Sequence, residues 1–311
     1  MIRPGSVLRY AEVSTVKIVL IALLVAVLGA GCWQHMRYVG VRRDLAQDRQ
    51  AFLYGSDTFH LIGYLRSEAI TDEGVLDALR ALKDATETVE GLEWIYAGRV
   101  LVNSTPSEQL GDIEWTACFL LPVPSRAAYD KAAAGALGSA LAVFPDAHIH
   151  GLERPAFANL LMHQGLGLLR IFDILTRAPS AFPFVQVEGA FEFPQAREIT
   201  GRLLAGEKLN PDAVVVFNLS RPGDAEQQTS NSGYGRRMLG AMAEGGYGPL
   251  HFGSAVEVDG GGEFEDIVLV YYPGPRFFAE MATSTFFQGI IGGKQLGDNQ
   301  STITVPVLSR L

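Results

Sequence analysis

Apolar positions along the chain form short strand-like runs and longer helical runs, and the same order of runs occurs twice. In the first half the predicted strands are residues 59–66, 94–102, 115–121 and 147–152, and the predicted helices are residues 72–89 and 126–144. In the second half the predicted strands are residues 213–221, 250–258, 267–272 and 302–308, and helical patterns cover residues 234–243 and 275–292. Strand-helix-strand-strand-helix-strand is the ferredoxin-like plan, so the chain predicts two such repeats in an α+β fold.

Glycine, proline and arginine positions keep a constant spacing between the two halves, which indicates a duplicated domain. Three residues recur 155 positions later: Arg66, Gly91 and Gly98 as Arg221, Gly246 and Gly253. Three more recur 151 positions later: Pro122, Pro124 and Gly138 as Pro273, Pro275 and Gly289. In the first half we expect Gly91 to end the first helix and the two prolines to end the third strand. Residues 259–262 (DGGG) read as a hairpin turn.

The N-terminus carries an uncharged apolar run at residues 18–33, preceded by Arg3, Arg9 and Lys17. This pattern is typical of export signals and signal anchors. Three interpretations stay open: an uncleaved anchor, a lipoprotein signal with Cys32 as the lipidated residue, and an ordinary cleaved signal. We expect attachment to a bacterial inner membrane with the globular part on the extracytoplasmic side. A reversed anchor with a cytoplasmic domain is the alternative.

The chain therefore divides into five predicted parts: residues 1–33 (signal anchor or lipoprotein signal), 34–56 (helical stalk), 57–154 (first repeat), 155–212 (helical linker) and 213–311 (second repeat). The linker contains an apolar-rich helix at residues 157–176 and a short helix at residues 195–204. The longer helix either packs at the domain interface or touches lipid. Interface packing is favoured, because Arg170 and Asp173 interrupt its apolar surface.

Composition narrows the function classes. The net charge of −9 excludes a typical nucleic-acid partner, because phosphate binding needs clustered Lys and Arg. Two cysteines build no disulfide framework, and Cys118 reads as a small buried apolar residue. No Gly-x-Ser-x-Gly, His-Glu-x-x-His or Cys-x-x-Cys motif occurs.

Residues 213–311 resemble a functionally uncharacterised family of dimeric α/β-barrel domains. The resemblance is carried by residues 216–221 (VFNLSR) and 265–273 (EDIVLVYYP). Residues 58–152 match more loosely, with Gly63 in place of the strand Asn and Trp115 in place of Asp266. The resemblance implies that the two repeats pair sheet to sheet into one barrel within the chain. This also suits an antiparallel sheet that has helices on only one face.

Strand alternation then sorts the candidate site residues. His60, Ile62, Tyr64 and Arg66 share the face of the first strand that would line the barrel, with Val215, Phe217, Leu219 and Arg221 as their second-copy counterparts. The candidate ligand-binding residues are His60, Tyr64, Arg66, Tyr96, Arg221 and His251. The simpler interpretation is that both arginines pair with acidic residues at the rim. His148 and His150 share one face of a strand, and we expect them to be exposed and without metal.

The leading hypothesis is a membrane-anchored accessory or binding protein that holds a small apolar or aromatic molecule in the barrel and needs no cofactor. In the wider superfamily the resemblance also includes cofactor-independent monooxygenases, lactone isomerases and haem-dependent chlorite-degrading enzymes. One alternative is therefore an enzyme of the cofactor-independent type acting through His60, Tyr64 and Arg66. Another is an interaction subunit of a membrane complex, whose protein partner the residues do not identify.

Overall fold

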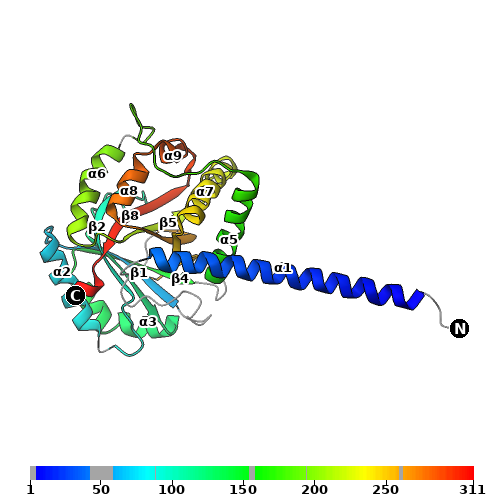
Figure 1. Ribbon diagram of the computed structural model, residues 1–311. Coiled ribbons are helices and arrows are strands. Elements are labelled where there is room, and N and C mark those ends of the chain that lie inside the picture. The colour runs from blue at the N-terminus through cyan, green and yellow to red at the C-terminus, as the bar shows by residue number, and fades with distance from the viewer. Residues whose placement is uncertain (1–4, 43–58, 88, 154–157, 194, 259–261) are drawn as a thin grey trace.

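The computed structural model describes residues 5–42, 59–87, 89–153, 158–193, 195–258 and 262–311 (Figure 1). A long N-terminal helix, α1 (Gly5–Val41), projects from a rounded body. The first repeat contains β1 (Phe59–Arg66), α2 (Asp72–Thr86), β2 (Tyr96–Thr105), β3 (Ala117–Val123), α3 (Arg126–Ala133), α4 (Ala136–Leu141) and β4 (Asp146–Glu153). Two helices follow, α5 (Ala158–Thr176) and α6 (Ala196–Ala205). The second repeat contains β5 (Val214–Arg221), α7 (Ala225–Gly245), β6 (Gly248–Glu257), β7 (Asp266–Tyr272), α8 (Pro275–Ala282), α9 (Thr285–Gln288) and β8 (Asp298–Pro306).

The eight strands close into one antiparallel barrel in the order β1-β3-β2-β8-β5-β7-β6-β4. Within this order the first repeat reads β4-β1-β3-β2 and the second reads β8-β5-β7-β6, which is the same arrangement. The repeats join where the second strand of each pairs with the last strand of the other, β2 with β8 and β6 with β4. The predicted intramolecular barrel of two ferredoxin-like repeats is confirmed.

Local sequence explains where the helices begin. Thr71 caps α2 by accepting a hydrogen bond from the Gly74 N–H. Asp224 opens α7 with a capping box in which Gln227 reaches back to the Asp224 backbone. The same helix ends at Gly246, whose φ of 78° lies in the left-handed region that glycine adopts without cost.

Four predicted boundaries are corrected. The predicted helix at residues 72–89 ends at Thr86, so Gly91 lies beyond its C-cap. The predicted helices at residues 126–144 and 275–292 are each broken, the first at Gly135 between α3 and α4. Pro122 does not end β3, which continues to Val123. Beyond Leu120 this strand pairs only with β1, and a proline is tolerated on such an open edge.

The N-terminal helix joins the body directly. Its stretch Thr15–Val41 is long and apolar enough to cross a membrane, and little of it is buried. Within the predicted stalk, the described residues continue α1, and Tyr38 is buried in the hydrophobic core. The Tyr271 hydroxyl donates a hydrogen bond to the Val41 carbonyl (2.9 Å). The remainder of the predicted stalk and most of the predicted glycine turn lie outside the described residues.

Candidate functional site

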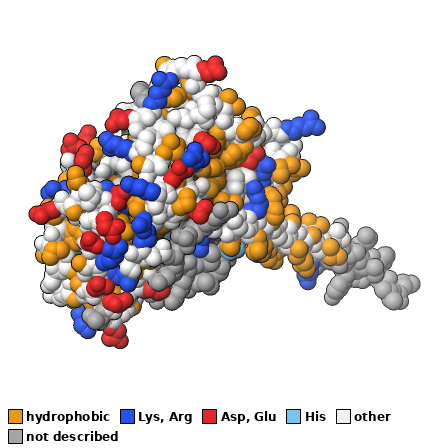
Figure 2. All heavy atoms as spheres, turned by 60° about the vertical axis from the view of Figure 1, so that its left-hand side comes forward, with side chains coloured by type: hydrophobic (Ala, Val, Ile, Leu, Met, Phe, Trp, Pro, Cys, Tyr) orange, Lys and Arg blue, Asp and Glu red, His pale blue; other side chains and the backbone are white. Residues whose placement is uncertain are grey.

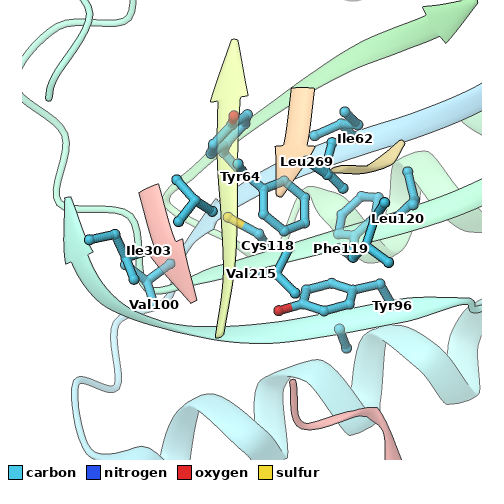
Figure 3. Close-up of a cluster of buried hydrophobic side chains, with 14 of the residues drawn as sticks. Ile62, Tyr64, Tyr96, Val100, Cys118, Phe119, Leu120, Val215, Leu269 and Ile303 are labelled. Atoms are coloured by element: carbon cyan, nitrogen blue, oxygen red, sulfur yellow. The ribbon is translucent and has the colours of Figure 1, made fainter. Parts of the chain in front are cut away.

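Aromatic side chains fill the barrel interior at its middle (Figure 3). Tyr64 and Tyr96 reach the Phe217 ring from β1 and β2, with ring centroids 6.3 and 5.3 Å from it. The Tyr96 hydroxyl lies 2.6 Å from the Thr304 Oγ1, and both residues are buried. Burial raises the pKa of the Tyr64 and Tyr96 phenols well above their usual value. Both stay protonated at neutral pH and serve as packing groups in this part of the barrel.

Four histidines line the same interior in two pairs. His60 and His251 are buried, with ring centroids 5.7 Å apart. His148 and His150 are also buried, and the Nδ1 of His150 lies 3.3 Å from the Nε2 of His148. The expectation that the latter pair is exposed was wrong, because closing the barrel encloses that face of β4. Among the described residues no group of three His, Cys, Asp or Glu side chains is placed to hold a metal ion.

The two predicted arginines lie at the barrel ends and form ion pairs. Arg66 pairs with Asp146, and the Arg221 guanidinium lies 3.6 Å from the Glu263 carboxylate. Their expected pairing with acidic rim residues is confirmed. Beside the first ion pair, a cavity of about 330 Å³ includes Trp115, Asp146 and His148 in its lining. Of the six candidate ligand-binding residues, none lines this cavity.

A larger cavity, of about 400 Å³, lies on the other side of the sheet, in the second repeat. It is a partly open space between the outward faces of β5, β7 and β8 and the helices α6, α7, α8 and α9, and none of the six candidate residues lines it. Most of its wall is apolar, including Val216, Met238, Met242, Val270, Phe278 and Ile303.

One end of this cavity is polar and centres on Lys294. Its Nζ lies 3.4 Å from the Oδ1 of Asn218, which also accepts a hydrogen bond from the Ser301 hydroxyl (3.1 Å). Burial of the amine lowers the pKa of Lys294 to about 8. Among the described lining residues, Lys294 carries the one formal charge and no carboxylate faces it. An ammonium group in an apolar cavity is suited to bind an anion or a carbonyl oxygen.

At the equivalent position in the first repeat the Phe119 ring occupies this side of the sheet, and one pair of residues accounts for the difference. Gly63 pairs with Phe119 across β1 and β3, whereas Asn218 pairs with Val268 at the equivalent place across β5 and β7. A Cβ on Gly63 would lie 2.1 Å from the Phe119 ring, which itself packs on Trp94. Phe119 therefore fills the first repeat where the smaller Val268 leaves room in the second.

Sequence reasoning missed this site because it considered the barrel interior as the place for a ligand. The available signal was Asn218, a polar residue that follows Val214 and Val216 on the helix-facing side of β5. Lys294 offered no motif, since it follows the short helical turn Ile291–Gly293 as an isolated basic residue. Only the tertiary structure brings these two side chains together.

The cavity does not fit a haem held by the usual nitrogen or thiolate ligand. No histidine or cysteine is among its described lining residues. His251, one of the candidate ligand-binding residues, faces His60 inside the barrel instead. Globins and peroxidases use a histidine, and P450 enzymes a cysteine, to hold the iron.

Comparisons with known proteins give structural matches alone. No protein-family profile and no curated protein matches the sequence. An anthrone oxidase-like protein matches with a TM-score of 0.42 and 10% sequence identity, over 82% of this chain and 95% of that one. A mutant chlorite dismutase from Candidatus Nitrospira defluvii matches with a TM-score of 0.42 and 10% identity, over 84% of this chain and 96% of that one. These likenesses concern the fold and carry no argument about activity.

Proposed function

We propose that this protein is a membrane-anchored binding protein for a small, mainly apolar molecule that carries one acidic or carbonyl group. The observation that carries the proposal is the cavity of about 400 Å³ with Lys294 at its polar end. Its volume falls in the range of about 300–1,000 Å³ found for small-molecule sites. The sequence predicts a small apolar or aromatic ligand in the barrel interior. The proposed ligand is also mainly apolar, but it carries a polar group and lies between the sheet and the helices.

The wall chemistry supports the ligand class. The flexible Met238 side chain can adapt its shape to an apolar ligand body, and the Phe278 ring offers it a large, rigid apolar surface. Asn218 and Ser301 lie beside the Lys294 amine and offer further hydrogen-bonding atoms at the same end. A ligand that places its acidic group at this end forms an ion pair with the Lys294 ammonium, which otherwise faces a mostly apolar space.

The apolar helix α1 supports attachment to a membrane, either as an anchor or as a signal segment. The proposal assigns it the anchor role, with the barrel on the extracytoplasmic side of a bacterial inner membrane. Protease access to the barrel in intact spheroplasts tests the orientation. Mass spectrometry of the mature N-terminus distinguishes the uncleaved helix from a chain that begins at a lipidated Cys32.

Ligand binding is tested on the full-length protein in detergent by native mass spectrometry, first for co-purified molecules. Naphthylacetate then serves as an acidic probe, and naphthylethanol as its neutral analogue. We expect the acidic probe to bind more tightly, and Lys294→Met to remove this preference. Lys131→Met, at an exposed lysine on α3, is the matched control.

A double variant tests the cavity itself. Asn218→Gly with Val268→Phe copies the Gly63–Phe119 pair that fills the first repeat. We expect this variant to fold and to bind neither probe. Probe binding that is equal in the wild type and in the filled variant would show that the cavity is not the site.

A further inference from the structure

Helix α5 exposes an apolar face that the barrel does not cover. The exposed residues on this face are Leu161, Leu168, Ile171, Phe172 and Leu175, with relative exposures from 40% to 77%. The opposite face is buried and includes His163, Gln164 and Leu166. Isolated exposed apolar residues are ordinary, but a contiguous face of large ones marks an interaction surface.

The buried side of α5 crosses α1 at a close contact between small residues. A Cβ on Gly167 would lie 2.3 Å from the Ala30 carbonyl oxygen, and a Cβ on Gly31 would overlap the Gln164 side chain. Small residues allow this close approach of two helix backbones, as they do between transmembrane helices. The two helices therefore form one unit, and Figure 1 shows α5 running across α1 where α1 leaves the body.

The end of α1 is also attached to α7, which fixes its direction. The Arg37 guanidinium donates hydrogen bonds to the carbonyls of Ala243 (2.8 Å) and Glu244 in the last turn of α7. A cation is favourable at this end of a helix, where carbonyl groups lack helical partners. The barrel consequently has a defined orientation relative to α1.

The uncharged part of α1 that stands clear of the body is too short to cross a bilayer alone. Nearly all side chains described before Ala30 are exposed, whereas Ala30 and Gly31 are buried. The uncharged stretch from Ile18 to Gly29 spans about 18 Å at 1.5 Å per residue. The hydrocarbon core is about 30 Å thick, so about 12 Å of it surrounds the part of α1 that contacts α5. Lipid at that depth reaches the exposed face of α5.

Two further residues lie at the expected level of the membrane surface. Trp33 on α1 is exposed, and Trp is enriched at the membrane–water boundary. Arg236 on α7 places its guanidinium 5.7 Å from the Phe172 ring on the exposed face of α5. A basic residue beside an apolar helix face is favourable next to anionic lipid headgroups. Figure 2 shows apolar side chains along α1 and on the body where the two meet.

We propose that α5 lies at the boundary between the headgroups and the hydrocarbon core of the bilayer that α1 spans, with Leu168, Phe172 and Leu175 inserted among the lipid chains. The barrel then rests on the membrane in one orientation and does not stand off on a stalk. This inference rests on the anchor role of α1 in the proposed function and is independent of ligand binding in the cavity. The exposed face of α5 contacts lipid and not a protein partner, because this face continues the apolar surface of α1.

The test uses the full-length protein with Cys32→Ala, reconstituted in vesicles of phosphatidylethanolamine and phosphatidylglycerol. One cysteine introduced at Leu168 or at Phe172 carries an environment-sensitive fluorophore, and Cys118 stays in place because it is buried and inaccessible to the label. The lipids carry a nitroxide quencher either near the headgroup or near the chain end. We expect both probes to be quenched several-fold more by the shallow nitroxide than a probe at Val143, which is also exposed but lies on the body away from α5. We also expect the probes at Leu168 and Phe172 to be protected from quenching by iodide in the aqueous phase.

A probe at Leu24, in the projecting part of α1, separates the two proposals. If the deep nitroxide does not quench Leu24, the anchor role of α1 is wrong. If Leu24 is quenched while Leu168 and Phe172 stay accessible to iodide like Val143, the inference about α5 is wrong and the anchor stands. A third outcome is that the probes on α5 are not quenched by the lipid nitroxides but become better protected from iodide as the protein-to-lipid ratio rises. In that case a second copy of the chain covers the exposed face of α5, and the inference is also wrong.

Discussion

The Nζ of Lys294 lies 3.4 Å from the Oδ1 of Asn218, at the polar end of an otherwise apolar cavity. The contact joins the loop after α9 to the middle of β5, two segments that are 76 residues apart in the chain. Because the amine is buried and no described lining residue is a carboxylate, its charge is available to a ligand.

The affinity for an acidic ligand should depend on pH through Lys294. The pKa of its amine is about 8, so raising the pH above this value removes the proton that attracts an anion. We expect naphthylacetate binding to weaken by up to about tenfold per pH unit above that point. Titration calorimetry from pH 6 to about 10 measures the effect. The Lys294→Arg variant should bind naphthylacetate without this pH dependence. If the affinity of Lys294→Met falls with pH as steeply as that of the wild type, the pH dependence belongs to another group.

The same residue should reduce the stability of the unliganded protein at neutral pH. Its pKa is lowered in the folded state, so between pH 8 and its ordinary value of 10.5 the unfolded chain binds more protons. Stability due to this group therefore rises with pH in that window and is lowest below it. We expect Lys294→Met to raise the free energy of unfolding at pH 7 by about 1–2 kcal/mol. Denaturant unfolding should show that the stability gained through Lys294→Met is smaller at pH 10 than at pH 7. An equal gain at both pH values would mean that it comes from side-chain packing and not from the charge.

Gly63→Ala should destabilise the first repeat, because the added Cβ would lie 2.1 Å from the Phe119 ring. Overpacking of this kind costs about 1–3 kcal/mol. Thermal unfolding measures the loss, and Phe119→Leu in the same chain should restore part of it. Gly201→Ala is the matched control, since its Cβ meets nothing within 4 Å on α6 and should stabilise the helix slightly. Equal effects at the two glycines would contradict the packing argument.

Gly167→Leu should separate α5 from α1, since even a Cβ at this position would lie 2.3 Å from the Ala30 carbonyl oxygen. We expect faster proteolysis between α1 and the barrel and a lower melting temperature in detergent. Gly165→Leu is the control two positions away, where a Cβ meets nothing within 4 Å. If both variants resist protease as the wild type does, the close crossing is not needed to hold the helices together.

The sequence alone was sufficient for the repeat architecture, because periodicity and turn residues act locally. Alternation in β1 placed His60 and Tyr64 on the interior face, and the paired positions of Arg66 and Arg221 marked the duplication. Helix ends were less predictable. Thr86 ends α2 well before Gly91, and its hydroxyl accepts a hydrogen bond from the Trp94 indole, a tertiary contact that the local pattern does not specify.

Only the tertiary structure decided where space remains inside the molecule. A cavity depends on the difference in volume between side chains that meet across strands, here Phe119 in one repeat and Val268 in the other. The position of Lys294 beside Asn218 and the uncovered face of α5 likewise depend on how distant segments pack. Local patterns specify which face of an element is apolar, but the fit between faces is a property of the folded chain.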